Sequence, residues 1–356
     1  IQITFAFIVL KWDLGRQALM KLSDGVQQIV NYANEGISFL FGGLVNNESI
    51  GMVFAISVLT IIIFFSSLIS VLYYLGIMQL IIKFIGGFLS KVLGTSKAES
   101  VSAAANIFVG QTEAPLVIRP FLNTMTRSQL FAVMTGGLAS VSGSVLVGYS
   151  LLGVPLEYLL AASFMAAPAG LVLAKLIMPE TEEIDESEFK LEKDTSATNV
   201  IEAAANGAGD GLRLAANVGA MLLAFIALIA LVNGILGGIG GLFGLENVTL
   251  ENILGYVFAP LAFAIGVPWE EAIGAGSFIG QKLVLNEFVA YSNFGPVIGE
   301  FSAKAGLIIS FALCGFANFS SMAILIGGLG GIAPAKRSTI AQLAVKAVLA
   351  GMLASL

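Results

Sequence analysis

Long runs of apolar residues constrain this chain more than any other feature. The clearest runs lie at residues 52–74, 130–152, 158–177, 219–236 and 307–326. An apolar helix needs about 20 residues to cross the hydrocarbon core of a membrane. Only 11% of all residues are charged, against about 25% in soluble domains. We therefore expect an all-α, multi-span integral membrane protein.

Other apolar segments do not read as simple spans. The two ends, 1–10 and 342–356, are expected to be spanning helices that are truncated in this sequence. Residues 14–44 and 77–94 carry charged side chains at helical spacing among apolar ones. That pattern predicts helices along the membrane interface, with helices packed against protein as the alternative.

Two further segments, 97–122 and 268–292, are too polar and too rich in Gly and Pro for lipid-facing spans. They are also too apolar for ordinary loops, so we predict re-entrant hairpins. Non-helical backbone at membrane depth is tolerated only where protein or a cavity surrounds it. Each hairpin therefore indicates a site.

An apolar segment with polar interruptions follows each hairpin, at 128–149 and at 307–331. The interrupting residues are Ser140, Ser142 and Ser144 in the first segment, and Asn318, Ser320 and Ser321 in the second. Interrupted segments in corresponding places of two halves are typical of transporters with inverted repeats and a site near the middle of the membrane.

These patterns divide the chain into consecutive regions. We expect scaffold spans and interfacial helices at 1–96, the first hairpin with its broken helix and a following span at 97–178, an acidic linker at 179–199, central spans at 200–267, the second hairpin and broken helix at 268–331, and a C-terminal span, expected to be truncated, at 332–356. Acidic residues of the linker account for the net charge of −6.

Composition excludes several classes of function. The chain has no His and one Cys, Cys314, which excludes disulfides within the chain, Cys/His zinc sites and His-based catalysis. Basic residues form no stripe for a nucleic-acid polymer. No nucleophile has a neighbouring base, so we expect no catalytic residue and no enzyme activity.

Glu113 and Glu287 lie inside long apolar, Gly-rich stretches. A charge at bilayer depth costs about 2.5 to 3.5 kcal/mol, so it survives where it faces a partner, an ion path or a wet cavity. Two such carboxylates favour a transporter. Structural ion pairs, Lys282 with Glu287 and Arg119 with Glu113, are the alternative, and a protonated Glu that carries a proton is another.

Small and polar residues mark two helix faces. Gly136, Ser140, Ser144 and Gly148 recur at every fourth position, which allows another backbone to approach closely. Plain helix packing explains the glycines equally well, whereas the hydroxyl of Ser140, beside carbonyls freed by a break, suits a hard cation.

Asn318 and Ser321 share a helix face near Phe316. They suit a ligand with hydroxyls and a flat ring, or they bond neighbouring helices.

Four motifs resemble those of the concentrative nucleoside transporters, and the resemblance covers nearly the whole chain. The motifs are SAAAN at 102–106, GQTEAP at 110–115, GQKLVLNEFVAY at 280–291 and CGFANFSS at 314–321. The resemblance implies a homotrimer built on a scaffold, whose protomers have two re-entrant hairpins, broken helices and interfacial helices in a lipid membrane. It implies symport of nucleosides such as uridine with sodium, without an organic cofactor, by an elevator-like movement in a bacterial inner membrane.

The resemblance also implies roles for individual residues. Gln111, Thr112 and Glu113 would face the nucleobase, Glu287, Asn318 and Ser321 would hold the ribose, and Val145, Leu214 and Phe316 would line the base pocket. Sodium would bind at Asn106, Val109, Ser140 and Val141.

Two other functions stay open at this point. The first is a proton-coupled nucleoside symporter in which Glu113 or Glu287 titrates, and the second is a membrane receptor that binds a nucleoside without moving it. For all three, we expect ribonucleosides to bind better than free bases, because a site built to bond a hydroxyl rejects an analogue that lacks it.

Overall fold

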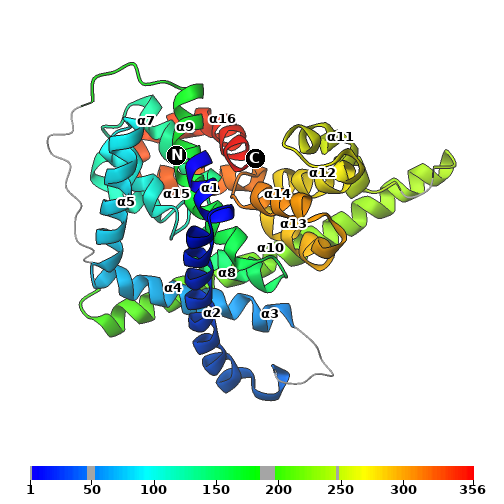
Figure 1. The fold of residues 1–356 in the computed structure, drawn as a ribbon, viewed down its shortest axis with the longest axis horizontal. Helices are drawn as coiled ribbons and strands as arrows, with labels where there is room; N and C mark the ends of the chain where they lie inside the picture. Colours follow the sequence, from blue (N-terminus) through cyan, green and yellow to red (C-terminus); the bar gives the residue numbers. More distant parts are fainter. Residues whose placement is uncertain (1, 46–52, 185–196, 246–247) are drawn as a thin grey trace.

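The computed structural model describes residues 2–45, 53–184, 197–245 and 248–356, and all regular secondary structure within these ranges is helical (Figure 1). This confirms the expected all-α class. Most of the predicted acidic linker, at 185–196, and the first residue of the predicted span 52–74 lie outside the described residues.

The chain begins with helices that lie outside the two hairpin regions. They are α1 (Gln2–Leu10), α2 (Asp13–Phe41), the short η1 (Gly42–Leu44), α3 (Phe54–Ser57), α4 (Leu59–Tyr74) and α5 (Ile77–Leu93). α2 and α5 cover the two segments predicted to be amphipathic. Each buries one face, α2 against α4 and α9 and α5 against α6, and exposes the other, so their position along an interface stays a prediction.

The first predicted hairpin consists of α6 (Lys97–Ala105), a turn, and the 3₁₀ segment η2 (Ala114–Phe121). After it, α7 (Arg127–Ala139) and α8 (Gly143–Leu151) are separated by the predicted break at Ser140, and α9 (Leu156–Ile177) follows. Helices that stop inside the fold need caps for their free amides. Ser96 caps α6 through Glu99, and Thr126 caps α7 through Gln129.

The second predicted hairpin repeats this order. It consists of α12 (Trp269–Val284) and α13 (Glu287–Phe294), followed by η3 (Gly295–Glu300), α14 (Ala303–Leu313) and α15 (Phe319–Ile332). The segment predicted as a span at 307–326 is interrupted at its polar residues, as expected of a broken helix. The chain unwinds between Cys314 and Asn318, so neither piece alone reaches about 20 residues.

The C-terminal helix is longer than predicted. After η4 (Pro334–Lys336), α16 runs over Arg337–Ser355 rather than starting at residue 342. Its basic start is accommodated because Lys336 Nζ donates to the carbonyl of Met125, 2.8 Å away, just before α7.

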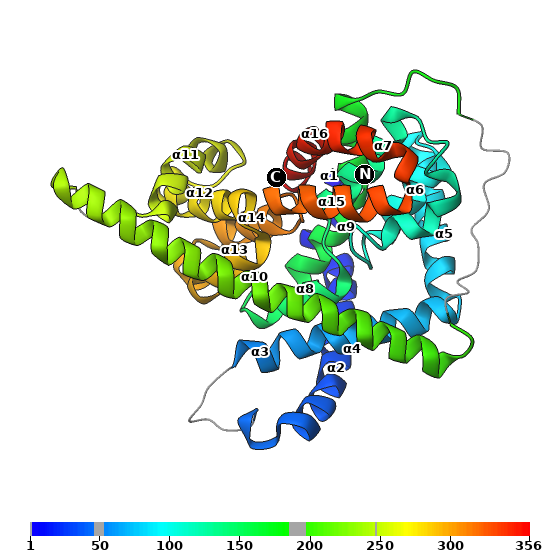
Figure 2. The ribbon, with the colours of Figure 1, turned by 180° about the vertical axis from the view of Figure 1, so that it is seen from behind.

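The most conspicuous difference from the prediction is α10 (Val200–Leu242), a helix of 43 residues where a span at 219–236 is expected. At about 1.5 Å per residue it measures roughly 65 Å. Figure 2 shows it running past both hairpin regions and along α4. Its early turns are held by close packing, since a Cβ on Gly211 would lie 2.7 Å from Cα of Ile63 in α4.

Membrane crossing can be judged by length and composition. Among the described residues, five helical stretches are long and apolar enough: Phe54–Tyr74, Arg127–Leu151, Leu156–Ile177, Val200–Leu242 and Pro334–Ser355. α11 (Leu250–Ala264) and α12 form a further pair bent by 116°. The chain is a multi-pass membrane protein.

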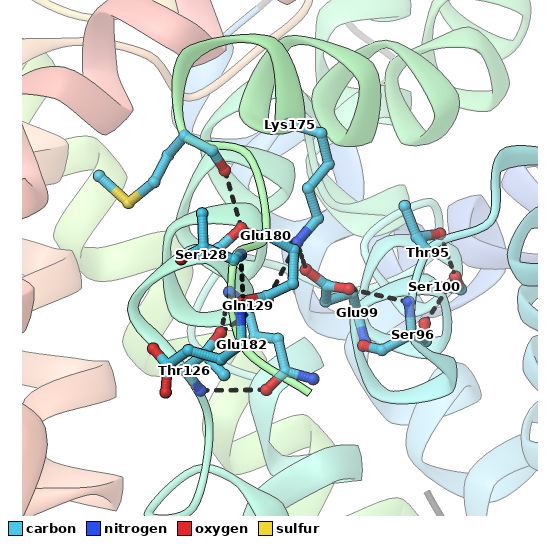
Figure 3. Close-up of polar contacts among 12 residues, drawn as sticks. Thr95, Ser96, Glu99, Ser100, Thr126, Ser128, Gln129, Lys175, Glu180 and Glu182 are labelled. Carbon is cyan, nitrogen blue, oxygen red and sulfur yellow. Dashed lines mark hydrogen bonds and ion pairs between the residues drawn. The ribbon is translucent and has the colours of Figure 1, made fainter. Parts of the chain in front are cut away.

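A polar cluster ties the base of the first hairpin to its neighbours (Figure 3). Lys175 of α9 forms an ion pair with the fully buried Glu99 of α6 and lies 3.7 Å from Oε2 of Glu180. Lys175 Nζ also donates to Ser128 Oγ of α7, at 2.8 Å. One ammonium therefore joins the ends of three helices.

Glu180 stays ionised at the rim of this cluster. Partial burial raises the pKa of Glu180, but hydrogen bonds from the hydroxyl of Thr126 and the amide of Glu182, and the charge of Lys175, outweigh it and place the pKa below the ordinary value.

We expect Lys175→Met to destabilise the protein strongly. The substitution leaves the Glu99 carboxylate buried without its cation, and breaking a buried pair from one side costs about 3–5 kcal/mol. Thermal unfolding of purified protein measures the effect, and adding Glu99→Gln should recover part of the loss. Lys91→Met, at an exposed lysine, is the control, and equal melting temperatures for Lys91→Met and Lys175→Met would contradict the expectation.

Candidate functional site

Both hairpins and both broken helices meet at one cavity of about 120 Å³. Its wall combines the turn of the first hairpin, the start of α8, the middle of α10, and the starts of α13 and α15. All nine residues predicted to bind substrate line this cavity: Gln111, Thr112, Glu113, Val145, Leu214, Glu287, Phe316, Asn318 and Ser321.

Glu287 is the buried carboxylate of the cavity. Its Oε1 accepts a hydrogen bond from Tyr149 Oη at 3.1 Å, and its Oε2 accepts one from Asn318 Nδ2 at 2.9 Å. Glu287 is also the first residue of α13, where a helix favours negative charge. Each carboxylate oxygen has a second lone pair, so the group can still accept hydrogen bonds from ligand hydroxyls.

The alternative of a structural ion pair between Lys282 and Glu287 is not found among the described residues. The ammonium of Lys282 instead donates to the carbonyl of Ala312 and to Ser355 Oγ, each at 2.7 Å. Spacing along a helix placed the two residues near each other, but a break at Leu285 turns α13 away from α12.

Two asparagines start the half-helices that face the cavity. Asn286 Oδ1 accepts from the amide of Val289 at 2.9 Å and caps α13. Asn318 Oδ1 accepts from the amide of Ser321 at 2.8 Å and caps α15, while its Nδ2 holds Glu287. Asn318 therefore links the start of one half-helix to the charged group of the other.

The turn of the first hairpin supplies the facing wall. Gln111 is buried, and its Oε1 has no hydrogen-bond donor in the described part of the chain. Thr112 Oγ1 donates to Glu113 Oε1 at 3.0 Å. Glu113 is exposed and, among the described residues, makes no ion pair with Arg119, so the alternative of a structural pair there is not found either.

The four residues predicted to bind sodium come from the hairpin turn and from the first break, and we call this group the second polar spot. Asn106 is buried, its Nδ2 donates to the carbonyl of Ser102 at 3.0 Å, and its Oδ1 finds no donor in the residues described. The carbonyls of Val109 and Val141 likewise accept no backbone amide there. Uncompensated buried oxygens are costly, and oxygen ligands are those that a hard cation requires.

Two contacts join the hairpin turn to the first break and to α7. The amide of Gly143 donates to the carbonyl of Phe108 at 2.9 Å. A Cβ on Gly137 would meet Asn106 Oδ1 at 3.7 Å and Gln111 Cβ at 2.9 Å. Within the predicted small-residue face, Gly136 packs against the hairpin, since a Cβ there would meet Asn106 Nδ2 at 3.7 Å, whereas a Cβ on Gly148 would meet Val58 at 3.2 Å.

The two breaks also contact each other directly. The amide of Phe316 donates to the carbonyl of Ser140 at 3.1 Å. Gly315 makes this approach possible, because a Cβ there would lie 2.8 Å from the carbonyl oxygen of Ala139. Ser140 belongs to the predicted cation site and Phe316 lines the cavity. This hydrogen bond therefore connects the predicted cation site directly to the cavity.

Comparison with known proteins identifies the chain. Family models described as the Na⁺ dependent nucleoside transporter C-terminus, the nucleoside recognition gate and the Na⁺ dependent nucleoside transporter N-terminus match residues 158–356, 55–155 and 1–44. The nucleoside permease NupC of Helicobacter pylori is 54% identical over all of this chain and 87% of its own length. An uncharacterized transporter of Bacillus subtilis, YutK, is 66% identical over all of this chain and 88% of its own length. The chain belongs to the concentrative nucleoside transporter family.

Solved structures of a family member agree with this assignment. CNTnw in an inward-facing substrate-bound state is 57% identical and superposes with a TM-score of 0.94 over 99% of this chain and 86% of its own. A CNTnw variant in an outward-facing state gives a TM-score of 0.96 over 99% of this chain and 87% of its own. This chain is thus a membrane transporter of the nucleoside transporter family rather than an enzyme, as expected, and its bacterial relatives are permeases consistent with the inner membrane.

Sequence reasoning missed several residues around the cavity of this nucleoside transporter. Tyr149, which holds Glu287, is hidden in the small-residue segment, and its phenol could have been noted as a polar group among apolar neighbours. The missed residues of the cavity wall are Gly110, Ser142, Val218, Met221, Leu222, Asn286, Phe288, Ser320 and Ile324. The three from α10, Val218, Met221 and Leu222, carry no signal, because they are ordinary apolar residues of a segment that is expected to span the membrane.

We expect Gly315→Ala to disrupt the contact between the two breaks. The new Cβ would clash with the carbonyl of Ala139 and so displace the neighbouring Ser140 carbonyl from the amide of Phe316. Nucleoside binding should then weaken at least about tenfold, the effect of about 1.4 kcal/mol. Equilibrium binding to purified protein measures it. The control is Gly327→Ala in α15, where a Cβ meets no atom within 4 Å, and comparable losses in both variants would contradict the prediction.

Proposed function

We propose that this protein is a sodium-coupled nucleoside symporter that works by an elevator-like alternation of access. The observation that carries the proposal is a buried carboxylate at the cavity that is held by neutral donors alone. Glu287, bonded by Tyr149 and Asn318, can accept hydrogen bonds from ribose hydroxyls. Such charged hydrogen bonds are worth about 1.5–3 kcal/mol.

The opposite wall of the cavity suits a nucleobase. Gln111 offers an unused amide oxygen, and Thr112 and Glu113 add a hydroxyl and a carboxylate at the same turn. Phe316, Val145 and Leu214 provide apolar surface for a flat ring. Gln111 and Thr112 each donate and accept hydrogen bonds, so these two side chains do not by themselves select a purine or a pyrimidine such as uracil.

Sodium fits the second polar spot. Asn106 Oδ1 and the carbonyls of Val109 and Val141 lack donors in the described residues, and Ser140 adds a hydroxyl. No carboxylate belongs to this set, so selectivity for sodium would rest on geometry and partial charges. The named relatives of mouse and rat, sodium/nucleoside cotransporter 1, are 40% identical over the whole of this chain.

Coupling follows from the shared backbone. A sodium ion at Asn106 and Val109 would order the same hairpin turn that presents Gln111 to the nucleoside. Across the cavity, Ser140 and Phe316 are hydrogen bonded. Sodium must then raise nucleoside affinity by the same factor by which nucleoside raises sodium affinity. A homotrimer in the membrane, as in the family resemblance, would provide the fixed frame for this movement.

Proton coupling is the second candidate, because Glu287 has no cation paired with it in the described residues. The carboxyl group of Glu287 could then carry a proton across the membrane, and the proton would replace sodium as the coupling ion.

Uptake into proteoliposomes separates these functions. We expect radiolabelled uridine to accumulate with an inward sodium gradient and not with a proton gradient alone. Accumulation driven only by protons would replace the sodium assignment, and binding without accumulation would indicate a receptor.

Glu287→Gln should lower uridine uptake by about ten- to a hundredfold. The NH2 group of the amide would face Tyr149 or Asn318, which are themselves donors, and the neutral amide oxygen is a weaker acceptor for the ribose hydroxyls. The matched control is Glu300→Gln, at an exposed acid outside the cavity. If the two variants transport equally well, ribose is held elsewhere.

Asn106→Leu and Ser140→Ala should each raise the sodium concentration for half-maximal uridine uptake at least about tenfold, since each removes an oxygen ligand. Asn123→Ala, in the exposed loop after the first hairpin, should leave it unchanged. A sodium response that survives in both site variants would rule out this ion site.

A further inference from the structure

Lys282 is a buried charge that the proposed function does not use. It lies in α12 of the second hairpin with 1% of its surface exposed. Among the described residues no carboxylate forms an ion pair with it. Its Nζ donates to the carbonyl of Ala312 and to Ser355 Oγ, both at 2.7 Å.

Both partners of Lys282 are free to accept a hydrogen bond from its ammonium group. Ser355 Oγ gives its own hydrogen to the carbonyl of Met352 at 2.9 Å, which leaves its lone pairs for Lys282. Ala312 belongs to the last turn of α14, whose carbonyls have no partner within the helix. The C-terminal end of a helix favours positive charge.

The second arm of the hairpin caps the same helix end. Tyr291 of α13 donates its hydroxyl to the carbonyl of Ser310 at 2.8 Å. Lys282 and Tyr291 therefore fix both arms of the second hairpin to the end of α14, directly before the break. Asn286 and Glu287 lie between these two anchors along the chain.

The corresponding place in the first repeat has a different chemistry. There the hairpin meets the break after α7, and the oxygens of Asn106, Val109 and Val141 have no donor in the described residues. The described side chains place no ammonium at that break. The first break thus presents oxygen atoms without donors among the described residues, whereas the second break is hydrogen bonded to the ammonium of Lys282.

We propose that the ammonium of Lys282 is a built-in cation of the second repeat, which fixes the second hairpin to its broken helix as an exchangeable sodium ion would fix the first. Lys282 is then a positioning residue for nucleoside binding, because it sets where Asn286 and Glu287 stand without touching the ligand. The comparison with sodium rests on the proposed function, but the role of the ammonium can be tested without it.

The test must separate charge from packing. Lys282→Met keeps a long side chain without charge or donors, and Lys282→Ala opens space for a small ion. We expect Lys282→Met to raise the Kd for uridine at least about tenfold at saturating sodium, with the melting temperature monitored in parallel. A Kd equal to that of the unaltered protein would overturn the proposal.

Rescue supplies the sharper readout. Ethylammonium at millimolar concentration should restore uridine binding to Lys282→Ala, because it returns a donating cation to the space. Tetramethylammonium has the same charge but no N–H group, so it should not restore binding. A folded Lys282→Ala protein that ethylammonium fails to rescue would overturn the proposal.

A gentler variant covers the case in which the Lys282 variants do not fold. Ser355→Ala removes one acceptor and keeps the charge, and it should weaken uridine binding several-fold in a folded protein, whereas unchanged binding would contradict the proposal. Uridine binding by the unaltered protein with and without sodium is measured in the same series. If uridine binding by the unaltered protein did not depend on sodium, the proposed sodium coupling would be refuted, but the proposed role of Lys282 would not.

Discussion

Peptide groups freed by a broken helix at membrane depth need partners inside the protein, and this need governs the arrangement of the whole fold. The chain breaks between α7 and α8 and again between α14 and α15. At each break the freed groups are met by a hairpin, and the amide of Phe316 bonds the carbonyl of Ser140 across the two breaks. Each hairpin thus supplies hydrogen-bond partners to the break that it meets, which explains why hairpins and broken helices occur together twice.

The same breaks create the site. A helix that starts inside the protein exposes amides and the positive end of its dipole, and α13 and α15 both start at the cavity. Asn286 and Asn318 satisfy the local amides. Glu287 sits at the first turn of α13, where a helix start stabilises its charge, and neutral donors hold it without cancelling that charge.

The sequence predicted this architecture to different degrees. Gly- and Pro-rich apolar segments and interrupting polar residues such as Ser140 and Asn318 indicated both hairpins and both breaks, because backbone outside a helix inside a membrane is rare and leaves a compositional trace. The individual binding residues were inferred mainly from motifs shared with a family. From the residues alone, Glu113, Glu287, Asn318 and Ser321 stood out, but their partners did not.

Long-range geometry explains what was missed. α10 extends well beyond its apolar core, and its early turns pack closely on α4 at Gly211, a contact that hydropathy does not report. Tyr149 reaches Glu287 from 138 positions away. The expected pair of Lys282 and Glu287 assumed a continuous helix, whereas the break at Leu285 separates them, and the ammonium finds a helix end 30 positions further along. Contacts of this kind are set by topology and leave no local pattern.

The two repeats are thus alike in backbone and unlike in charge. A transporter gains from one hairpin that loosens when its ion leaves, because a ligand shifts an equilibrium only by its differential affinity for two states. A second hairpin that loosened independently would let the nucleoside dissociate without the ion, and coupling would be lost. In the arrangement proposed above, a lysine that cannot leave the protein would remove this possibility, since it would keep Glu287 in place whether or not sodium is bound. Under this view the movable element of coupling is the turn at Gln111, and the second hairpin is the fixed half of the site.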